Sequence, residues 1–145
     1  MLLQQGITYT MKDTLANGVT LKKRFEVDKQ RTIDFMGEEL RVYATPAMVW
    51  DIENTCRELT LAHLDEGEDS VGARIETDHL GATLLGMSVE ITATVTEVDA
   101  RRVSFEIEVH DPLELVGRAR HIRFVIDKER QKQRLEAKAE KARAQ

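Results

Sequence analysis

The stretch of sequence that decides the fold is TPAMVWDIENTCRELTLAH, residues 45–63. Its apolar residues recur every three or four positions, which is the spacing of one face of an α-helix. Thr45 followed by Pro46 is a typical helix start, with a hydroxyl as N-cap and a proline in the first turn. Asp65-Glu66-Gly67 predicts the end of the helix. The predicted buried stripe consists of Met48, Ile52, Cys56, Leu59 and Ala62.

Trp50 and Glu53 fall outside this stripe, on the flank or the far side of the predicted helix. A tryptophan in that position indicates that a second side of the helix is also covered. We expect a second subunit to provide this cover.

Around the helix, apolar and polar residues alternate in five segments, which is typical of strands with one buried face. The segments are residues 19–27, 71–75, 87–95, 103–109 and 116–126. The last three are joined by connections too short for a crossover helix, so they must pair antiparallel. One long helix beside five antiparallel strands predicts an α+β fold, with the helix against a curved sheet.

Size, charge and cysteine content limit the possible functions. The chain has 145 residues, the size of one domain, and a formal net charge of −5, which argues against nucleic acid as the main partner. No apolar run approaches the ~20 residues that span a bilayer, so we expect no membrane partner. Met1 to Thr10 lacks the hydrophobic stretch of a signal peptide, and the single cysteine, Cys56, cannot form an intrachain disulfide. These features predict a cytoplasmic protein.

The sequence divides into three parts. Residues 1–14 are expected to be a flexible N-terminal segment, residues 15–127 the folded domain, and residues 128–145 a charged tail that is helical or disordered. The tail carries seven Lys or Arg and three Glu, a net charge of +4, and Leu135 is its only large apolar residue. Because it has little to bury, a solvated appendage is favoured over a docking element for acidic partners.

Thr45, Glu53 and His79 are the candidate chemical residues. A hydroxyl, a carboxylate and an imidazole can together orient water or activate a nucleophile, and a nearby helix N-terminus favours an oxyanion. Each also has a structural interpretation: Thr45 as the N-cap, Glu53 as a solvated partner of Arg57, and His79 as a turn residue. Spacing alone does not bring the three together.

The remaining titratable residues give weaker signals. Cys56 belongs to the apolar stripe and is expected to pack in the core. Arg118 and Arg120 alternate onto one face of their strand and Arg123 onto the other, which allows either cross-strand pairing with Glu106 or Glu108, or an anionic ligand. No metal-ligand spacing is present among the other histidines, which are His63, His110 and His121.

Several short motifs stand out along the chain. They are ATPAMV at 44–49 followed by Glu53, VGAR at 71–74, DHLGAT at 78–83 with Gly86-Met87, the hairpin from Thr96 to Asp111, and Gly117-Arg118 with His121 and Arg123. Together they resemble the fluoroacetyl-CoA thioesterase-like branch of the hotdog-fold thioesterases. The resemblance covers roughly Leu15 to Asp127.

This resemblance implies a long central helix wrapped by an antiparallel sheet of about five strands. It also implies a homodimer that hydrolyses a short-chain acyl-CoA at the subunit interface, with no metal and no cofactor beyond the CoA thioester substrate. By position, the catalytic residues of the branch fall on Thr45, Glu53 and His79, and its substrate contacts fall on Gly72 and Arg123.

One segment departs from the branch. Fluoroacetyl-specific members carry an aromatic lid before the threonine, whereas residues 36–42 read MGEELRV and hold no aromatic pair. A general short-chain acyl thioester is therefore expected in place of fluoroacetyl-CoA. Two other functions suit the fold: a non-catalytic module that binds acyl-CoA or a hydrophobic ligand, and a hydratase. A hydratase needs an Asp/His pair, and Asp78 and His79 point to opposite faces of a strand.

Overall fold

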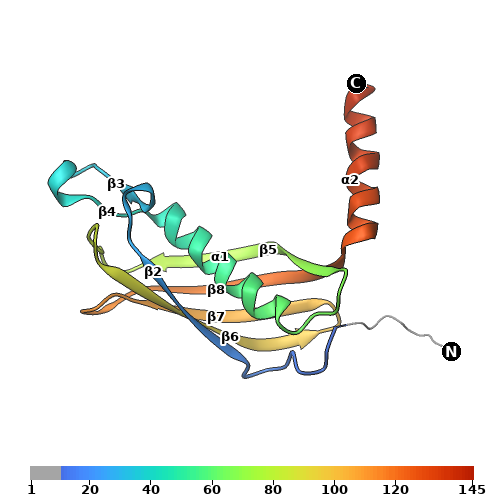
Figure 1. Cartoon of the computed structure of the whole chain (residues 1–145), viewed down its shortest axis with the longest axis horizontal. Coiled ribbons are helices and arrows are strands. Elements are labelled where there is room, and N and C mark those ends of the chain that lie inside the picture. Colours follow the sequence, from blue (N-terminus) through green and yellow to red (C-terminus); the bar gives the residue numbers. More distant parts are fainter. Residues whose placement is uncertain (1–10) are drawn as a thin grey trace.

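The computed structural model describes residues 11–145 and consists of a five-stranded sheet, a long helix against it and a projecting C-terminal helix (Figure 1). A two-stranded sheet, β3 and β4, and two 3-10 turns, η1 and η2, connect β2 to α1. Residues 1–10 of the expected N-terminal segment lie outside the described residues. The bounds are β2 Thr20–Glu26, η1 Lys29–Arg31, β3 Thr32–Ile33, η2 Glu38–Leu40, β4 Val42–Tyr43, α1 Thr45–Leu61, β5 Glu68–His79, β6 Ser88–Asp99, β7 Arg102–His110, β8 Leu115–Asp127 and α2 Lys128–Arg143.

The main sheet has the order β2-β6-β7-β8-β5, and all neighbouring strands pair antiparallel. The five strands and their antiparallel pairing agree with the alternation in the sequence. The weakest predicted segment, residues 71–75, is part of the twelve-residue strand β5. β5 is an edge strand of the described sheet, so its outer backbone groups have no partner strand among residues 11–145.

The core lies between α1 and the sheet. Met48, Ile52 and Cys56 are fully buried on α1, where they meet the inward-facing residues of β6, β7 and β8. The predicted stripe is wrong only at its end, because α1 stops at Leu61 and Ala62 is exposed beyond it. Leu64 fills that end of the core instead.

Thr45 does not cap α1, contrary to its structural interpretation. The N-cap is Ala44, which has no side-chain oxygen, and Thr45 is the first helical residue, followed by Pro46. Because the Thr45 hydroxyl is not used on the helix's own backbone, it can contact another element.

A β-bulge interrupts β5 next to Gly72. The register against β8 runs Gly72↔Arg123 and then Arg74↔Ile122, so Ala73 is the extra residue. One extra residue reverses the alternation of faces along a strand. Gly72 and His79, which are seven residues apart, therefore both face α1.

The two ends of the described chain differ in how they are held. The backbone amide of Lys12 donates to the His63 carbonyl at 3.0 Å, and Thr14 hydrogen-bonds the His63 ring at 2.8 Å. The part of the expected flexible segment that is described, residues 11–14, is thus attached to the end of α1. The C-terminal tail is helix α2, capped by Asp127, and its side chains are unburied.

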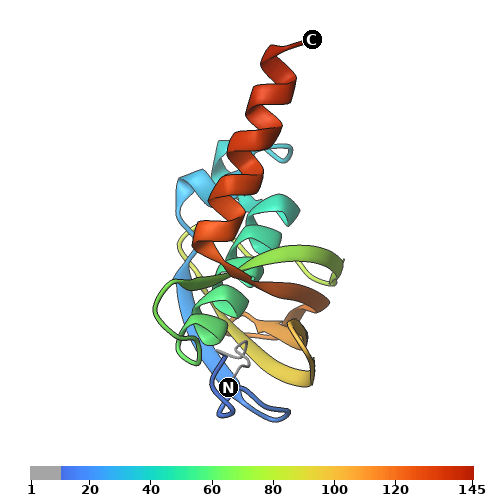
Figure 2. The same ribbon diagram turned by 90° about the vertical axis from the view of Figure 1, so that its right-hand side faces the viewer.

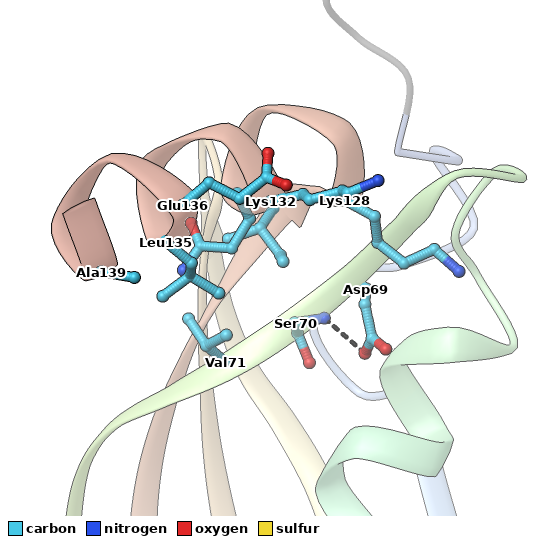
Figure 3. A pocket seen from close by; sticks show the side chains of 10 residues that line it. Asp69, Ser70, Val71, Lys128, Lys132, Leu135, Glu136 and Ala139 are labelled. Atoms are coloured by element: carbon cyan, nitrogen blue, oxygen red, sulfur yellow. Dashed lines mark hydrogen bonds between the residues drawn. The ribbon is translucent and has the colours of Figure 1, made fainter.

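Helix α2 projects beyond the β5 edge and stands clear of the sheet in two views (Figures 1 and 2). A groove of about 520 Å³ lies between its first turns and β5, lined by Leu135, Ala139 and Val71 among others (Figure 3). Val71 points toward Leu135, whereas the neighbouring Gly72 faces α1. No helix among residues 11–145 combines the length and the apolar character needed to cross a membrane.

Candidate active site

The start of α1 meets the end of β5 through a side-chain hydrogen bond. The Thr45 hydroxyl lies 2.7 Å from Nδ1 of His79. The two residues are 34 positions apart in the sequence, so the contact depends on the packing of α1 across β5. The structure thus brings together two of the three candidate residues.

The surroundings of His79 keep its imidazole neutral at neutral pH. Burial lowers the pKa of His79, and the Tyr43 ring meets it edge-on at a centroid distance of 6.2 Å. Nε2 has no hydrogen-bond partner among the described residues. A neutral imidazole with one nitrogen bound to a hydroxyl and the other unengaged is suited to proton transfer.

Glu53 lies in a second cluster, with Arg123 and Gly72. Its Oε1 is 3.8 Å from Nη1 of Arg123, and the Glu53 side chain is 38% exposed. A Cβ added to Gly72 would stand 2.7 Å from the same Oε1, so only glycine leaves room for this carboxylate. The expected pairing of Glu53 with Arg57 is wrong, because Arg57 forms a two-bond ion pair with Asp69.

Arg123 is buried and is held by two hydrogen bonds to Ser70. Its Nε donates to the Ser70 hydroxyl at 2.7 Å and its Nη2 to the Ser70 carbonyl at 2.9 Å. Burial lowers the pKa of Arg123, but an arginine pKa starts so high that the group stays charged. The cluster therefore places a fixed positive charge beside the Glu53 carboxylate. Arg118 lies on the opposite face of β8 and faces Glu108, as one of the two interpretations expects.

The two clusters do not converge within one chain. Thr45 and Glu53 are eight residues apart on α1, about 12 Å along the helix axis. Gly72 and His79 are six ladder positions apart on β5, about 20 Å along the strand. A single copy of the chain thus holds Thr45 with His79 at one end of β5, and Glu53 with Gly72 and Arg123 at the other.

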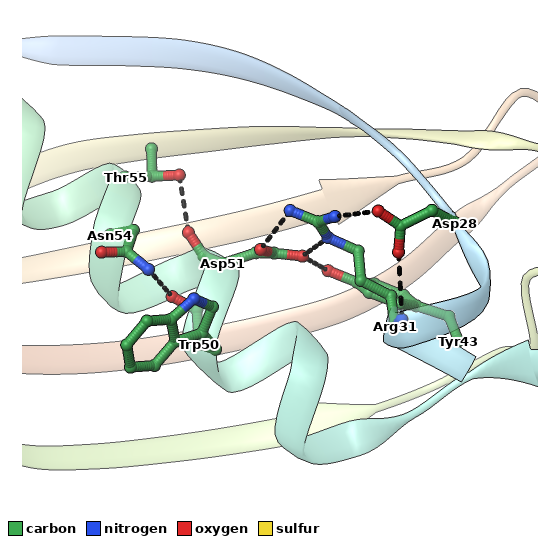
Figure 4. Close-up of polar contacts among 7 residues, drawn as sticks. All are labelled: Asp28, Arg31, Tyr43, Trp50, Asp51, Asn54 and Thr55. Atoms are coloured by element: carbon green, nitrogen blue, oxygen red, sulfur yellow. Dashed lines mark hydrogen bonds and ion pairs between the residues drawn. The ribbon is translucent and has the colours of Figure 1, made fainter. Parts of the chain in front are cut away.

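The sequence did not single out a buried ionic network behind Thr45. Asp51 is 1% exposed and accepts from the Tyr43 hydroxyl at 2.6 Å, and from Nε and Nη2 of Arg31 at 2.9 and 3.2 Å (Figure 4). Asp51 lies next to Trp50, outside the apolar stripe, and its i+4 neighbour Thr55 bonds only its backbone carbonyl. No local sequence pattern predicts this network, because the partners of Asp51 lie on other elements, Arg31 on η1 and Tyr43 on β4.

Replacing Asp51 with alanine should lower the free energy of unfolding by about 3 kcal/mol, because it leaves the Tyr43 hydroxyl and the Arg31 guanidinium without their buried partner. Asp28→Asn is the matched control, since Asp28 also pairs with Arg31 but is half exposed. That change should cost less than about 1 kcal/mol. Urea unfolding of the two variants measures both values, and equal losses would contradict the assignment of Asp51 as the anchor.

Acidification should destabilise the fold through two histidines, His121, which is buried, and His79, which is partly buried. Burial lowers the pKa of both His79 and His121 in the folded protein, while the unfolded chain titrates near pH 6.5. Below pH 6.5 the unfolded state therefore binds more protons, and stability falls as the pH drops from 6.5 toward the folded-state pKa values. Urea unfolding at pH 7.5 and 5.5 should give the lower free energy at pH 5.5.

The control for this pH effect is His110→Ala, because His110 is exposed. His79→Ala should reduce the difference between the two pH values, and His110→Ala should leave it unchanged. Equal stability of the unmodified protein at both pH values would show that the buried imidazoles do not link folding to pH.

Cys56 contributes packing and no nucleophile. It is fully buried, and burial raises the pKa of its thiol to about 12. The thiolate fraction at neutral pH is therefore negligible. No three His, Cys, Asp or Glu side chains within residues 11–145 are grouped so as to hold a metal ion.

The helix wrapped by a curved antiparallel sheet is the hotdog fold, and solved structures of thioesterases share it. A thioesterase superfamily member from Thermus thermophilus superposes with a TM-score of 0.83 at 28% identity, over 90% of this chain and 98% of that one. A variant of the fluoroacetyl-CoA-specific thioesterase superposes with a TM-score of 0.79 at 30% identity, over 88% and 99%.

Sequence comparison narrows the class to one family. Residues 27–129 match the family described as fluoroacetyl-CoA-specific thioesterase. The fluoroacetyl-CoA thioesterase of Streptantibioticus cattleyicolor is 32% identical over 127 residues, which cover 83% of this chain and 91% of that protein. The chain belongs to the fluoroacetyl-CoA-specific thioesterase family.

Proposed function

We propose that this protein is an acyl-CoA thioesterase that hydrolyses a short-chain acyl thioester to the free acid and CoA, without a cofactor. The family and the pairing of a hydroxyl with a partly buried, neutral imidazole support this function. We place it in the cytoplasm, where a single buried cysteine suits a reducing compartment.

The active site of the proposed enzyme is completed by a second copy of the chain. This proposal is supported by the positions of the two clusters, which lie at opposite ends of the edge strand β5. If two β5 strands pair antiparallel around a twofold axis that passes midway between Gly72 and His79, Gly72 of one copy lies beside His79 of the other. Neighbouring strands are about 4.8 Å apart, so Thr45 and His79 then share a cleft with Glu53 and Arg123 of the second copy.

This arrangement also covers the side of α1 that one chain leaves open. Trp50 is 67% exposed in the single chain, although a large aromatic residue is normally buried. A homodimer joined along β5 would bring a second α1 toward it. The proposed dimer thus accounts for both the open edge strand and the exposed tryptophan.

In the proposed reaction, a new C–O bond forms at the acyl carbon and the C–S bond to CoA breaks. Glu53 either removes a proton from the attacking water or attacks the carbonyl itself, to give an anhydride that water then cleaves. The first backbone N–H groups of α1 stabilise the oxyanion. Where the Thr45 hydroxyl donates to Nδ1 of His79, Nε2 carries the hydrogen that passes to the leaving sulfur. The proton that the attacking water releases then returns to Nε2 and restores the neutral ring.

The acyl group would be held near the segment before β4. Phe35 and Met36 are exposed there, at 70% and 59%. Phe35 lies one residue before the stretch compared with the aromatic lid, so the segment has one aromatic residue and no pair. This composition supports a short acyl group of general type over a strict requirement for fluoroacetyl.

The function is tested by supplying acetyl-, propionyl-, fluoroacetyl- and longer acyl-CoAs and measuring free thiol. The expected result is turnover of the short-chain esters by a dimer identified by sedimentation. If the folded protein cleaves none of them, the enzymatic function is wrong. Binding of the esters without hydrolysis would instead identify an acyl-CoA-binding module.

A further inference from the structure

His121, a residue without a role in the proposed mechanism, lies directly beneath the Glu53 cluster. It is on β8 two positions before Arg123, and it is 2% exposed. Its Nδ1 is 2.8 Å from the Arg74 carbonyl, and its Nε2 is 3.1 Å from Nη1 of Arg123. The ring also stacks on Phe105 at a centroid distance of 6.0 Å.

The hydrogen-bond partners of His121 determine its protonation. A guanidinium can only donate, so Nε2 must accept from Arg123. A carbonyl can only accept, so Nδ1 must carry the hydrogen and donate to Arg74. Both bonds are made at once only by the neutral ring with its hydrogen on Nδ1. Burial, which lowers the pKa of His121, favours the same neutral form.

Nη1 is the part of Arg123 that faces the proposed catalytic carboxylate. Nε and Nη2 are bound by Ser70, which fixes the plane of the guanidinium. Nη1 has two neighbours: Nε2 of His121 at 3.1 Å and Oε1 of Glu53 at 3.8 Å. Nη1 carries two hydrogens, so His121 accepts one of them and holds this nitrogen in place, while the other is left for Glu53.

We propose that His121 is a positioning residue of the thioesterase reaction: its neutral imidazole accepts one N–H of Arg123 Nη1 and thereby holds this nitrogen at its distance from the Glu53 carboxylate. The inference rests on the proposed function, because it assumes that Glu53 reacts. Without this acceptor, both N–H groups of Nη1 are left to Glu53, and an ion pair that closes would move the carboxylate from its present position. A misplacement of about 1 Å in a reacting group can lower the rate about 10²-fold.

Two substitutions of His121 separate this role from simple support of the β5 bulge. His121→Gln places an amide oxygen near the position of Nε2 and keeps the acceptor for Arg123. His121→Asn places its amide near Nδ1 and keeps the bond to the Arg74 carbonyl, but loses Arg123. We expect kcat to fall about 10²-fold in the asparagine variant, with KM little changed, and by less than about 5-fold in the glutamine variant.

The opposite order, with asparagine active and glutamine inactive, would assign His121 to the bulge and overturn the proposal. Equal activity of the two variants would overturn it as well. Thermal unfolding of both variants ensures that folded proteins are compared. Because free-thiol release by the unmodified enzyme is measured first, failure of the thioesterase function is distinguished from failure of this inference.

A double-mutant cycle and a spectroscopic measurement complete the test. In an Arg123→Lys background, His121→Asn should cost little more, because the group that it positions is already gone. Independent, additive losses would contradict the proposal. ¹⁵N NMR of the unmodified protein at pH 7 should find Nε2 of His121 without a hydrogen, and a protonated Nε2 would overturn the assignment even if no variant folds.

Discussion

Mixing Glu53→Gln subunits with His79→Ala subunits is expected to restore thioesterase activity that neither variant has alone. Each substitution should lower kcat by about 10²–10⁴-fold, the usual contribution of a proton-transfer residue. In the proposed dimer, each site takes His79 from one copy and Glu53 from the other. A mixed dimer therefore has one site with both residues intact and one site with neither.

The size of the recovery follows from the twofold symmetry. With random exchange of equal amounts of the two variants, half of the dimers are mixed and each has one intact site, so activity per subunit should reach about a quarter of the wild-type value. The measurement is free-thiol release after the two variants have been unfolded and refolded together.

Two controls make the outcome decisive. Refolding each variant alone should leave it inactive, and mixing Thr45→Ala with His79→Ala should restore nothing, because both residues come from the same end of the same chain. Absence of recovery in the Glu53 and His79 mixture would mean that Glu53 and His79 of one chain act together, and the shared site would be wrong.

The parts of the fold that were predictable from the sequence are those that depend on a regular period. The apolar stripe of α1 and the alternation in β6, β7 and β8 are produced by burial on one face, and burial is recorded in the residue pattern. The end of the stripe at Ala62 was predicted wrongly because the chain turns there and Leu64 takes the core position. The regular spacing of apolar residues in a helix does not predict such a turn.

The candidate site was predictable only in part, because its contacts are long-range. The resemblance identified Thr45 and His79, and the structure brings them into contact across 34 residues. The bulge at Ala73 could not be read from the sequence, although it turns Gly72 and His79 to the same face. The alternation of His121 with Arg123 on one face was visible, but their contact also requires the Arg74 carbonyl that lies beside the bulge.

Gly72→Ala is expected to remove most of the activity while leaving the fold intact. An added Cβ would stand 2.7 Å from Glu53 Oε1, which is far closer than two such atoms can approach. The closest atom is the end of a flexible side chain, so the carboxylate moves and the backbone does not, while His121 Cε1, at 3.3 Å from the added Cβ, needs to shift by only a few tenths of an ångström. We expect kcat/KM to fall about 10²-fold through misplacement of Glu53, and the free energy of unfolding to change by less than about 1 kcal/mol.

Two other glycines, Gly81 and Gly117, serve as controls for the general effect of adding a methyl group. At Gly81 the nearest atom to an added Cβ is Val116 Cγ1 at 3.4 Å, so Gly81→Ala should change neither activity nor stability appreciably. At Gly117 the Cβ would meet Met48 Sδ at 2.7 Å inside the core, so Gly117→Ala should lower stability by about 1–3 kcal/mol. The contradicting result is that Gly72→Ala lowers stability as Gly117→Ala does and leaves the turnover of the folded fraction unchanged. That result would show that catalysis does not depend on the space that Gly72 leaves for the Glu53 carboxylate.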